Sequence, residues 1–169
     1  MNILETERLV IRVQTTEDAA FILELMNTPS WLEFIGDRGV RTIEDAKAYI
    51  LNGAIRMYEQ HGFCLFLVER KEDHVPLGIC GLVKRDTLED VDIGFAFHPK
   101  YWAKGYAYEA ASAVMAYGKD TLGLKRIVAI TDQDNHASAK LLEKVGLQFE
   151  RLIQLSNDSE KLKLFVFNK

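Results

Sequence analysis

A short stretch at residues 101–110, YWAKGYAYEA, is the first candidate for chemistry in this sequence. The residues that follow it have the composition of a good helix, and Gly105 stands just before them. Glycine near a helix start costs roughly 0.5–1 kcal/mol relative to alanine, so another demand must favour it here. The first N–H groups of a helix lack intrahelical partners, and an anion can bind them where no side chain blocks its approach. Gly105, the small Ala103 and Ala107, and the charge of Lys104 therefore predict a phosphate or pyrophosphate site.

This candidate site differs from two familiar phosphate-binding loops. A Walker loop needs an earlier glycine and a Ser or Thr after its Gly-Lys pair, whereas the order here is Lys104-Gly105-Tyr106. A dinucleotide fingerprint needs three glycines in the pattern G-x-G-x-x-G after an early strand, and this stretch has one. The stretch alone also allows a second interpretation, in which Gly105 merely lets the helix pack closely on a neighbour.

The elements that must position this stretch begin with a strand and two helices. RLVIRVQ (8–14) alternates apolar and polar residues, as a half-buried strand does. The capping-box sequences TTED and TIED mark the starts of the two helices, and Gly62 is expected to end the second. The segment TPSWLEFIGDRG (28–39) between the helices is expected to be a loop rich in aromatic and apolar residues.

The rest of the chain predicts most of a sheet. Three strands follow one another as an antiparallel meander, and then come a helix from Tyr106 to Thr121, a strand, a capped helix and two terminal strands. These strands are GFCLFLVER (62–70), LGICGLVKR (77–85), VDIGFAF (91–97), RIVAIT (126–131), LQFERLIQL (147–155) and KLKLFVFNK (161–169). The order predicts an α/β (α+β mixed) fold: a mixed sheet with helices on both faces and one right-handed parallel crossover.

Bulk composition narrows the class of protein. A chain of 169 residues suits one domain over 1–169, because it buries about 70% of its unfolded surface. The net charge of −4 argues against nucleic-acid binding, which calls for a basic face. No segment approaches the roughly 18 apolar residues that span a bilayer, and the N-terminus lacks a secretory pattern, so we expect a cytoplasmic protein without a membrane partner. Cys64 and Cys80 lie in apolar runs as reduced thiols, and the scattered histidines lack ligand spacing, so no metal is expected.

Four segments, in this order, resemble the GNAT superfamily of acyl-CoA N-acyltransferases, and within it the ribosomal-protein-alanine acetyltransferase (RimJ/RimL-like) branch. They are LETERLVIR, TIEDAKAYI, VDIGFAFHPKYWAKGYAYEA and ITDQDNHASAKLLEKVGLQFE. The resemblance extends over nearly the whole chain and implies the acyl-CoA N-acyltransferase fold. In that fold a mostly antiparallel sheet contains one splayed parallel strand pair. The resemblance also implies acetyl-CoA as the acyl donor, without a metal.

The resemblance assigns acetyl-CoA contacts to particular residues. The pyrophosphate would be held by the backbone N–H groups of residues 103–108, with Gly105 keeping the route open. The pantetheine arm would pair with the backbone of the splayed strand and with Asn135, and Ser138 would lie near the thioester sulfur. Lys140 would face the 3′-phosphate. The implied contacts are therefore Phe95, Ala96, Phe97, Ala103, Lys104, Gly105, Tyr106, Ala107, Tyr108, Asn135, Ser138 and Lys140.

The catalytic residues follow from the same resemblance and from the chemistry of amines. An amine usually attacks the thioester directly in this family, so no cysteine nucleophile is needed. The protonated amine must first lose a proton, and Asp92 is the candidate base, with a solvated strand-face aspartate as the alternative. Leu142 stands where many members carry a tyrosine acid, which leaves Ser138 as the proton donor to the leaving thiolate. Ala103 replaces a glycine usual in the branch and should reduce cofactor affinity.

The acceptor is implied only by class. Segment 28–39 lies where the family places acceptor contacts, and Trp31, Phe34 and Arg38 are the candidates there. The acceptor would be a primary amine, on a protein N-terminus or on a small molecule. Two other functions stay open: a non-catalytic acyl-CoA sensor, which the leucine at the acid position favours, and a nucleotide-phosphate binder. The two terminal strands could pair across the two-fold axis of a homodimer or form an internal hairpin.

Overall fold

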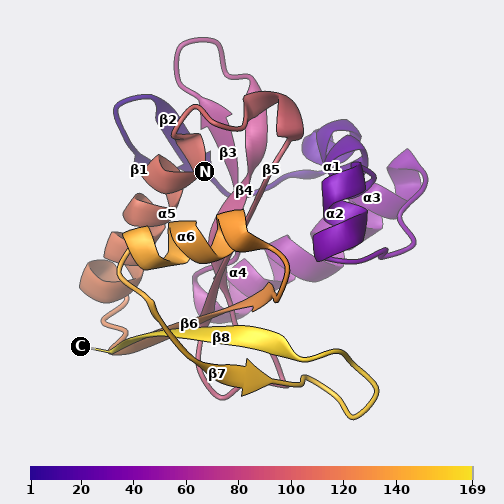
Figure 1. Cartoon of the computed structure of the whole chain (residues 1–169). Coiled ribbons are helices and arrows are strands. Elements are labelled where there is room, and N and C mark those ends of the chain that lie inside the picture. Colours follow the sequence, from indigo (N-terminus) through magenta and orange to yellow (C-terminus); the bar gives the residue numbers. More distant parts are fainter. Residues whose placement is uncertain (169) are drawn as a thin grey trace.

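The computed structural model describes residues 1–168, and its centre is one eight-stranded sheet (Figure 1). Across the sheet the strands follow the order β1-β2-β3-β4-β5-β6-β8-β7. Neighbouring strands are antiparallel except β5 and β6, which are parallel, so the predicted mixed sheet is confirmed. The strands are β1 (Asn2–Glu5), β2 (Leu9–Arg12), β3 (Leu65–Arg70), β4 (Pro76–Val83), β5 (Asp92–Phe97), β6 (Arg126–Asp132), β7 (Gln148–Ile153) and β8 (Leu162–Asn168).

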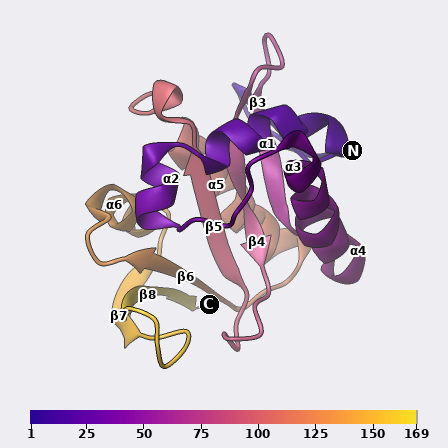
Figure 2. The same ribbon diagram turned by 90° about the vertical axis from the view of Figure 1, so that its right-hand side faces the viewer.

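Helices cover both faces of this sheet, as the sequence predicts. They are α1 (Ala19–Met26), α2 (Pro29–Phe34), α3 (Ile43–Ile50), α4 (Arg56–His61), α5 (Tyr106–Ala116) and α6 (His136–Lys144). On β3, Phe66 and Val68 share a core cluster with residues of α5 and α6, whereas Leu67 shares another with residues of α1, α2 and α3. Successive strand residues point to opposite faces, so the two clusters lie on opposite sides of the sheet. Figure 2 looks onto the face that carries α1, α2 and α3.

Local sequence signals set where the helices begin and end. Both predicted capping boxes form: the side chains of Thr15 and Thr42 accept hydrogen bonds from backbone N–H groups, and the aspartate three residues later reaches back. Gly62 ends α4 with φ 78°, as predicted. Between α3 and α4 the helix widens into a π-helical turn, Leu51–Ile55, that the sequence did not indicate.

Two N-terminal predictions were wrong in part. The first predicted strand, 8–14, is confined to β2, and the residues before it form an additional strand, β1, that pairs with β2 as a hairpin. Segment 28–39 is not a loop throughout, because α2 starts at Pro29. Thr28 caps that helix by accepting a hydrogen bond from the Trp31 N–H at 3.4 Å, and proline suits the first helical position.

The end of the chain forms the internal hairpin that the sequence allowed. β8 pairs with β7 on one side and with β6 on the other, so β7 lies at the edge of the sheet. A homodimer through this edge stays a prediction.

The parallel pair separates soon after it forms. β5 and β6 pair where Asp92 faces Val128, and the Val128 N–H donates to the carbonyl of Val91 at 3.0 Å. From this contact the two strands run apart (Figure 2), which confirms the predicted splay. The strand end that leads into α5 therefore lies beside an open gap.

Candidate active site

A cavity of about 1110 Å³ opens where β5 and β6 separate. It is lined by most of the residues predicted from the sequence: Trp31, Phe34, Arg38, Asp92, Phe95, Ala96, Phe97, Ala103, Gly105, Tyr106, Ala107, Tyr108, Asn135 and Ser138. Lys104 and Lys140 are exposed and do not line it. The fold thus brings three separate groups of predicted site residues, within 31–38, 92–108 and 135–138, to one cavity.

The turn before α5 has the geometry of an anion site. Gly105 is the N-cap at φ 82° and ψ 4°, and no side chain caps the helix. Ala103 also has a positive φ, 61°. The first N–H groups of α5 are therefore free of a capping side chain, and Ala103, Gly105 and Ala107 beside them are small. Alanine in the left-handed region costs roughly 1–2 kcal/mol, so this turn retains strain.

Arg8, in the turn between β1 and β2, holds the turn before α5 (residues 103–105) in place. Its Nη1 donates to the Lys104 carbonyl at 3.0 Å, its Nε donates to Glu109 Oε1 at 2.7 Å, and its guanidinium lies 4.5 Å from the centre of the Tyr106 ring. Glu109 also accepts from the Arg8 N–H at 2.9 Å and from the Thr6 hydroxyl. Burial alone would raise the pKa of Glu109, but these hydrogen bonds outweigh it and the pKa is lowered. Glu109 is therefore a charged anchor for the start of α5.

The side of β5 that faces β6 offers backbone groups to a ligand. The carbonyl of Val91 points toward β6, because it accepts from Val128. Backbone groups two residues apart on a strand point the same way, so those of Phe95 and Phe97 face the gap. The indole Nε1 of Trp102 already donates to the Phe97 carbonyl at 2.8 Å. Phe95 and the Phe97 N–H are left for an extended ligand that adds to the strand.

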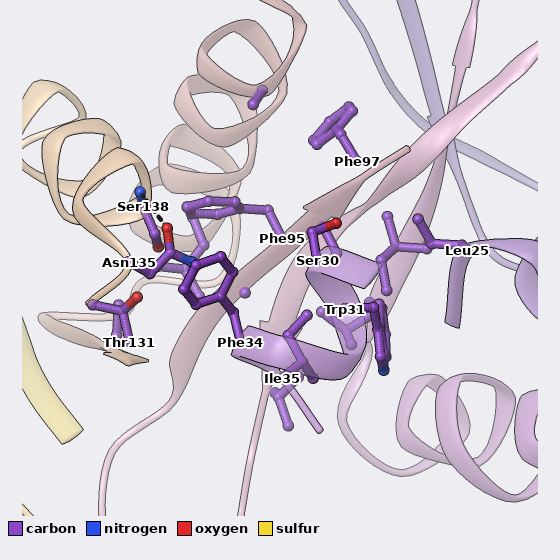
Figure 3. Close-up of a pocket in the computed structure, with 18 of the residues that line it drawn as sticks. Leu25, Ser30, Trp31, Phe34, Ile35, Phe95, Phe97, Thr131, Asn135 and Ser138 are labelled. Carbon is purple, nitrogen blue, oxygen red and sulfur yellow. Dashed lines mark hydrogen bonds between the residues drawn. The ribbon is translucent and has the colours of Figure 1, made fainter. Parts of the chain in front are cut away.

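The opposite wall comes from β6 and α6 (Figure 3). Asn135 is the N-cap of α6, and its Oδ1 accepts from the Ser138 N–H at 3.2 Å, which leaves its Nδ2 as a donor. Thr131 is 7% exposed, lines the cavity, and has no hydroxyl partner among residues 1–168. Leu142 is buried at 1% exposure and can donate no proton. Ser138 and Thr131 are thus the hydroxyl groups on this wall.

Asp92 is 1% exposed, so the solvated alternative is wrong. The Nε of Arg85 donates to both of its carboxylate oxygens, at 3.1 and 3.3 Å. Burial raises the pKa of Asp92, and the attraction of Arg85 offsets only part of that rise. A raised pKa makes a carboxylate a better proton acceptor near neutral pH. Asp92 lies on the same strand face as Ala96, which packs with the α1–α3 cluster.

The predicted acceptor residues differ in their surroundings. Trp31 is 5% exposed and its Nε1 donates to the Gly36 carbonyl at 3.1 Å, so it forms part of the wall and of the core. Phe34 is half-buried, and Figure 3 shows its ring facing Asn135 across the gap. Arg38 is exposed at the edge of the cavity. The predicted acceptor residues therefore lie on the α2 side of the gap.

Metal and thiol chemistry find no support among residues 1–168. No group of three or more His, Cys, Asp and Glu side chains there could hold a metal ion. A separate finding is that no helix within residues 1–168 is long and apolar enough to cross a bilayer. Cys64 and Cys80 are buried away from the cavity, and burial raises the pKa of Cys64 to about 12. The described cavity lining thus offers no thiolate nucleophile.

Comparison with known proteins agrees with this geometry. The sequence profile described as an acetyltransferase (GNAT) domain matches residues 8–148. This chain belongs to the GNAT acetyltransferases. A relative named uncharacterized N-acetyltransferase YoaA, from Bacillus subtilis (strain 168), is 33% identical over 153 residues, which are 90% of this chain and 86% of that protein.

Solved GNAT structures share the fold. A GNAT-family acetyltransferase from Bacillus anthracis superposes with a TM-score of 0.81 at 27% identity, over 99% of this chain and 98% of that one. RimL, named as a ribosomal L7/L12 α-N-protein acetyltransferase in complex with coenzyme A, superposes with a TM-score of 0.83 over 99% and 98% of the two chains. Its identity is 15%, so that likeness shows the fold alone. The expected resemblance to the ribosomal-protein branch is confirmed at the level of fold.

The cavity of this GNAT protein also fits coenzyme A on its own geometry. The strand edge at Phe95 suits the amides of a pantetheine arm, and the uncapped start of α5 at the far end suits a pyrophosphate. On the α1–α3 face of β5, between Asp92 and Ala96, Gly94 leaves space: a Cβ there would meet, within 4 Å, only Leu65 Cδ2, at 3.4 Å.

Sequence reasoning missed several residues of the site. Arg85 had a usable signal, since the turn DTLED joins two strands and places Arg85 beside Asp92 across the hairpin. Arg8 had none, because its partner Glu109 lies 101 positions away. Thr131 sat within a predicted strand, and its orientation depends on the splay.

Proposed function

We propose that this GNAT acetyltransferase is a single domain that transfers the acetyl group of acetyl-CoA to a primary amine by direct attack within a ternary complex. The observation that carries the proposal is the open strand edge of β5, which ends beside the uncapped start of α5. Pyrophosphate oxygens would accept from backbone N–H groups of residues 103–108. The exposed ammonium groups of Lys104 and Lys140 would add attraction from outside the cavity.

Backbone and side-chain groups along the gap would hold the donor. The pantetheine arm would pair with the Phe95 carbonyl and the Phe97 N–H, and Asn135 Nδ2 would donate to the same arm. The Phe95 N–H would face the thioester oxygen and stabilise the negative charge that develops there. Holding the donor in line with the amine removes the orientational entropy from the reaction.

Proton transfer would use groups on both sides of the gap. Asp92 would accept a proton from the acceptor ammonium, directly or through one water, because its burial raises its pKa above that of an ordinary aspartate. Arg85 fixes the orientation of that carboxylate through two contacts. Ser138 would give a proton to the departing thiolate, since Leu142 has none to give. Trp31 and Phe34 would form the wall beside the amine.

A thermal-shift titration combined with thiol release tests this proposal. A ligand at a hundred times its dissociation constant stabilises the fold by about 2.7 kcal/mol. We expect acetyl-CoA and CoA, but not ATP, to raise the melting temperature, and a panel of primary amines to include acceptors that release free CoA thiol. A rise with ATP alone would instead identify a nucleotide-phosphate binder.

The second candidate, a non-catalytic acyl-CoA sensor, is favoured by the buried Leu142 and by the ion pair that occupies Asp92. Both candidates predict CoA binding, so thiol release separates them. Tight binding with no thiol release across the panel would favour the sensor. Loss of release in Asp92→Asn with CoA binding retained would favour the enzyme.

A further inference from the structure

The cavity continues onto the α1–α3 face of the sheet, and its charge there has one sign. The charged lining residues away from β6 and α6 are Arg38, Arg56, Arg85 and Asp92, whereas Asp132 and Asp134 line the cavity at the end of β6 and before α6. Arg85 and Asp92 pair at 3.1 Å and add no net charge. Arg38, from the connection between α2 and α3, and Arg56, at the start of α4, contribute two positive charges to a cavity wall.

The pairing of the other arginines sets these two apart. The chain has nine arginines. Seven form ion pairs with Asp or Glu: Arg8, Arg12, Arg41, Arg70, Arg85, Arg126 and Arg151. Within residues 1–168, the remaining two, Arg38 and Arg56, have no ion pair or side-chain hydrogen bond, and both line the same cavity. Unpaired guanidinium groups are therefore confined to the place where an acceptor would bind.

The backbone before Arg56 gives an independent reason to look at this wall. The π-helical turn Leu51–Ile55 ends directly at Arg56, and Asn52, Gly53 and Ala54 from that turn line the cavity. A π-helical turn holds one more residue than an α-helical turn, so it rotates the residues after it by about 100°. Such single turns are frequent at functional sites. Here the turn changes which residues of α4 face the cavity, and Arg56 is the first of them.

We propose that the acceptor carries an anionic group, a carboxylate or a phosphate, in addition to its amine, and that Arg38 and Arg56 bind this group. The planar guanidinium matches both anions and binds them through paired hydrogen bonds. The anion also orients the acceptor, because Arg38 and Arg56 hold one end of it and leave the amine end for Asp92. The same two arginines repel polyamines. This inference rests on the proposed acetyl transfer to an amine.

Matched pairs of amines test the acceptor class. The two members of each pair share the amine and differ in the anion: β-alanine against β-alaninamide, and O-phosphoethanolamine against ethanolamine, together with further acid and amide pairs of larger amines. We expect the acid member to have at least a tenfold higher kcat/KM in the preferred pair. The two pair types separate a carboxylate from a phosphate. Equal rates within every pair, or no acetylation of any acid, would overturn the inference.

Charge-removing variants locate the effect. Arg38→Gln and Arg56→Gln should each raise KM for the acid member about tenfold or more, while kcat, the rate with the amide member and the thermal shift with CoA stay unchanged. Arg151→Gln is the matched control, because its side chain on β7 is 60% exposed and lies outside the cavity. Equal loss with acid and amide, or the same loss in the control, would refute the role of the two arginines. Failure of the CoA shift in the unmodified protein would instead contradict the proposed function.

Discussion

Two positions in the turn before α5, Ala103 and Gly105, should change the stability of the protein in opposite directions when one methyl group is removed or added. Ala103 has φ 61° and Gly105 has φ 82°, so both lie in the left-handed region that favours glycine. Ala103→Gly removes a strain of roughly 1–2 kcal/mol and adds unfolded-chain entropy that opposes it by about 0.4–1 kcal/mol. The difference is a net gain in unfolding free energy of up to about 1.6 kcal/mol, or up to about 6 °C in melting temperature for a chain of this length.

Gly105→Ala should lose a comparable amount, for two reasons. It places a side chain in the left-handed region, and its Cβ would lie 3.3 Å from Arg8 Nη2. Displacing that guanidinium would weaken its hydrogen bond to the Lys104 carbonyl. The same substitution narrows the approach to the helix start, so CoA affinity should also fall, whereas it should rise in Ala103→Gly.

Thermal melting of both variants, with and without CoA, measures these changes. Ala107→Gly is the matched control: Ala107 lies in the first turn of α5 with helical geometry, so the change to glycine should only destabilise. If Ala103→Gly lowers the melting temperature as the control does, the strain assigned to Ala103 is absent. If Gly105→Ala leaves CoA binding intact, the anion site lies elsewhere.

Three further outcomes follow from the site. Asp92→Asn should lower kcat by about 10²–10⁴-fold with CoA binding retained, and a full rate in the variant would show that Asp92 is not the base. In the unmodified enzyme kcat/KM should fall on acidification at a pH above the pKa range of an ordinary aspartate, because the pKa of Asp92 is raised. The lowered pKa of Glu109 contributes stability that is present above its unfolded pKa and is lost as pH falls through its folded pKa. In Glu109→Gln the melting temperature should therefore fall less steeply on acidification. An unchanged acid dependence would show that Glu109 does not anchor the start of α5 as a charged group. Gly94→Ala should fold, because its Cβ meets only Leu65 within 4 Å, yet slow acetyl transfer in a thiol-release assay because it narrows the acceptor side of β5; full activity would show that this space is not used.

The sequence predicted the elements of the fold well where short-range signals act. The capping boxes at Thr15 and Thr42 and the stop at Gly62 formed as expected, because each depends on hydrogen bonds within a few residues. The helix α2 was missed although Thr28 and Pro29 are good start signals, since the aromatic residues after them suggested a loop. The two π-helical turns had no signal in the sequence: one is Leu51–Ile55, and the other, Tyr117–Thr121, follows α5 within the predicted helix 106–121.

The sequence predicted part of the candidate site, namely the part that depends on residues close together in the chain. The stretch around Gly105 indicated an anion site from local composition, and the resemblance supplied the strand edge and Asn135. The Arg8 anchor and the unpaired state of Arg56 depend on contacts that are decided only in the folded chain. The sequence could not separate a solvated Asp92 from a buried one, because the partner Arg85 becomes visible only once the hairpin is formed.

In the proposed reaction one strand, β5, would serve both reactants, because its two side-chain faces and its backbone edge point in three directions. The side chains of Asp92 and Ala96 point to the α1–α3 face, where the acceptor would lie, and those of Phe95 and Phe97 point to the face of α5. The backbone edge of the same strand faces the gap and the donor. A shift of one residue in the register of β5 would exchange the two side-chain faces and remove the carboxylate from the acceptor side. The six residue pairs with β4 therefore set which side chains of β5 face each side, and in the proposed reaction they would determine which reactant each residue meets.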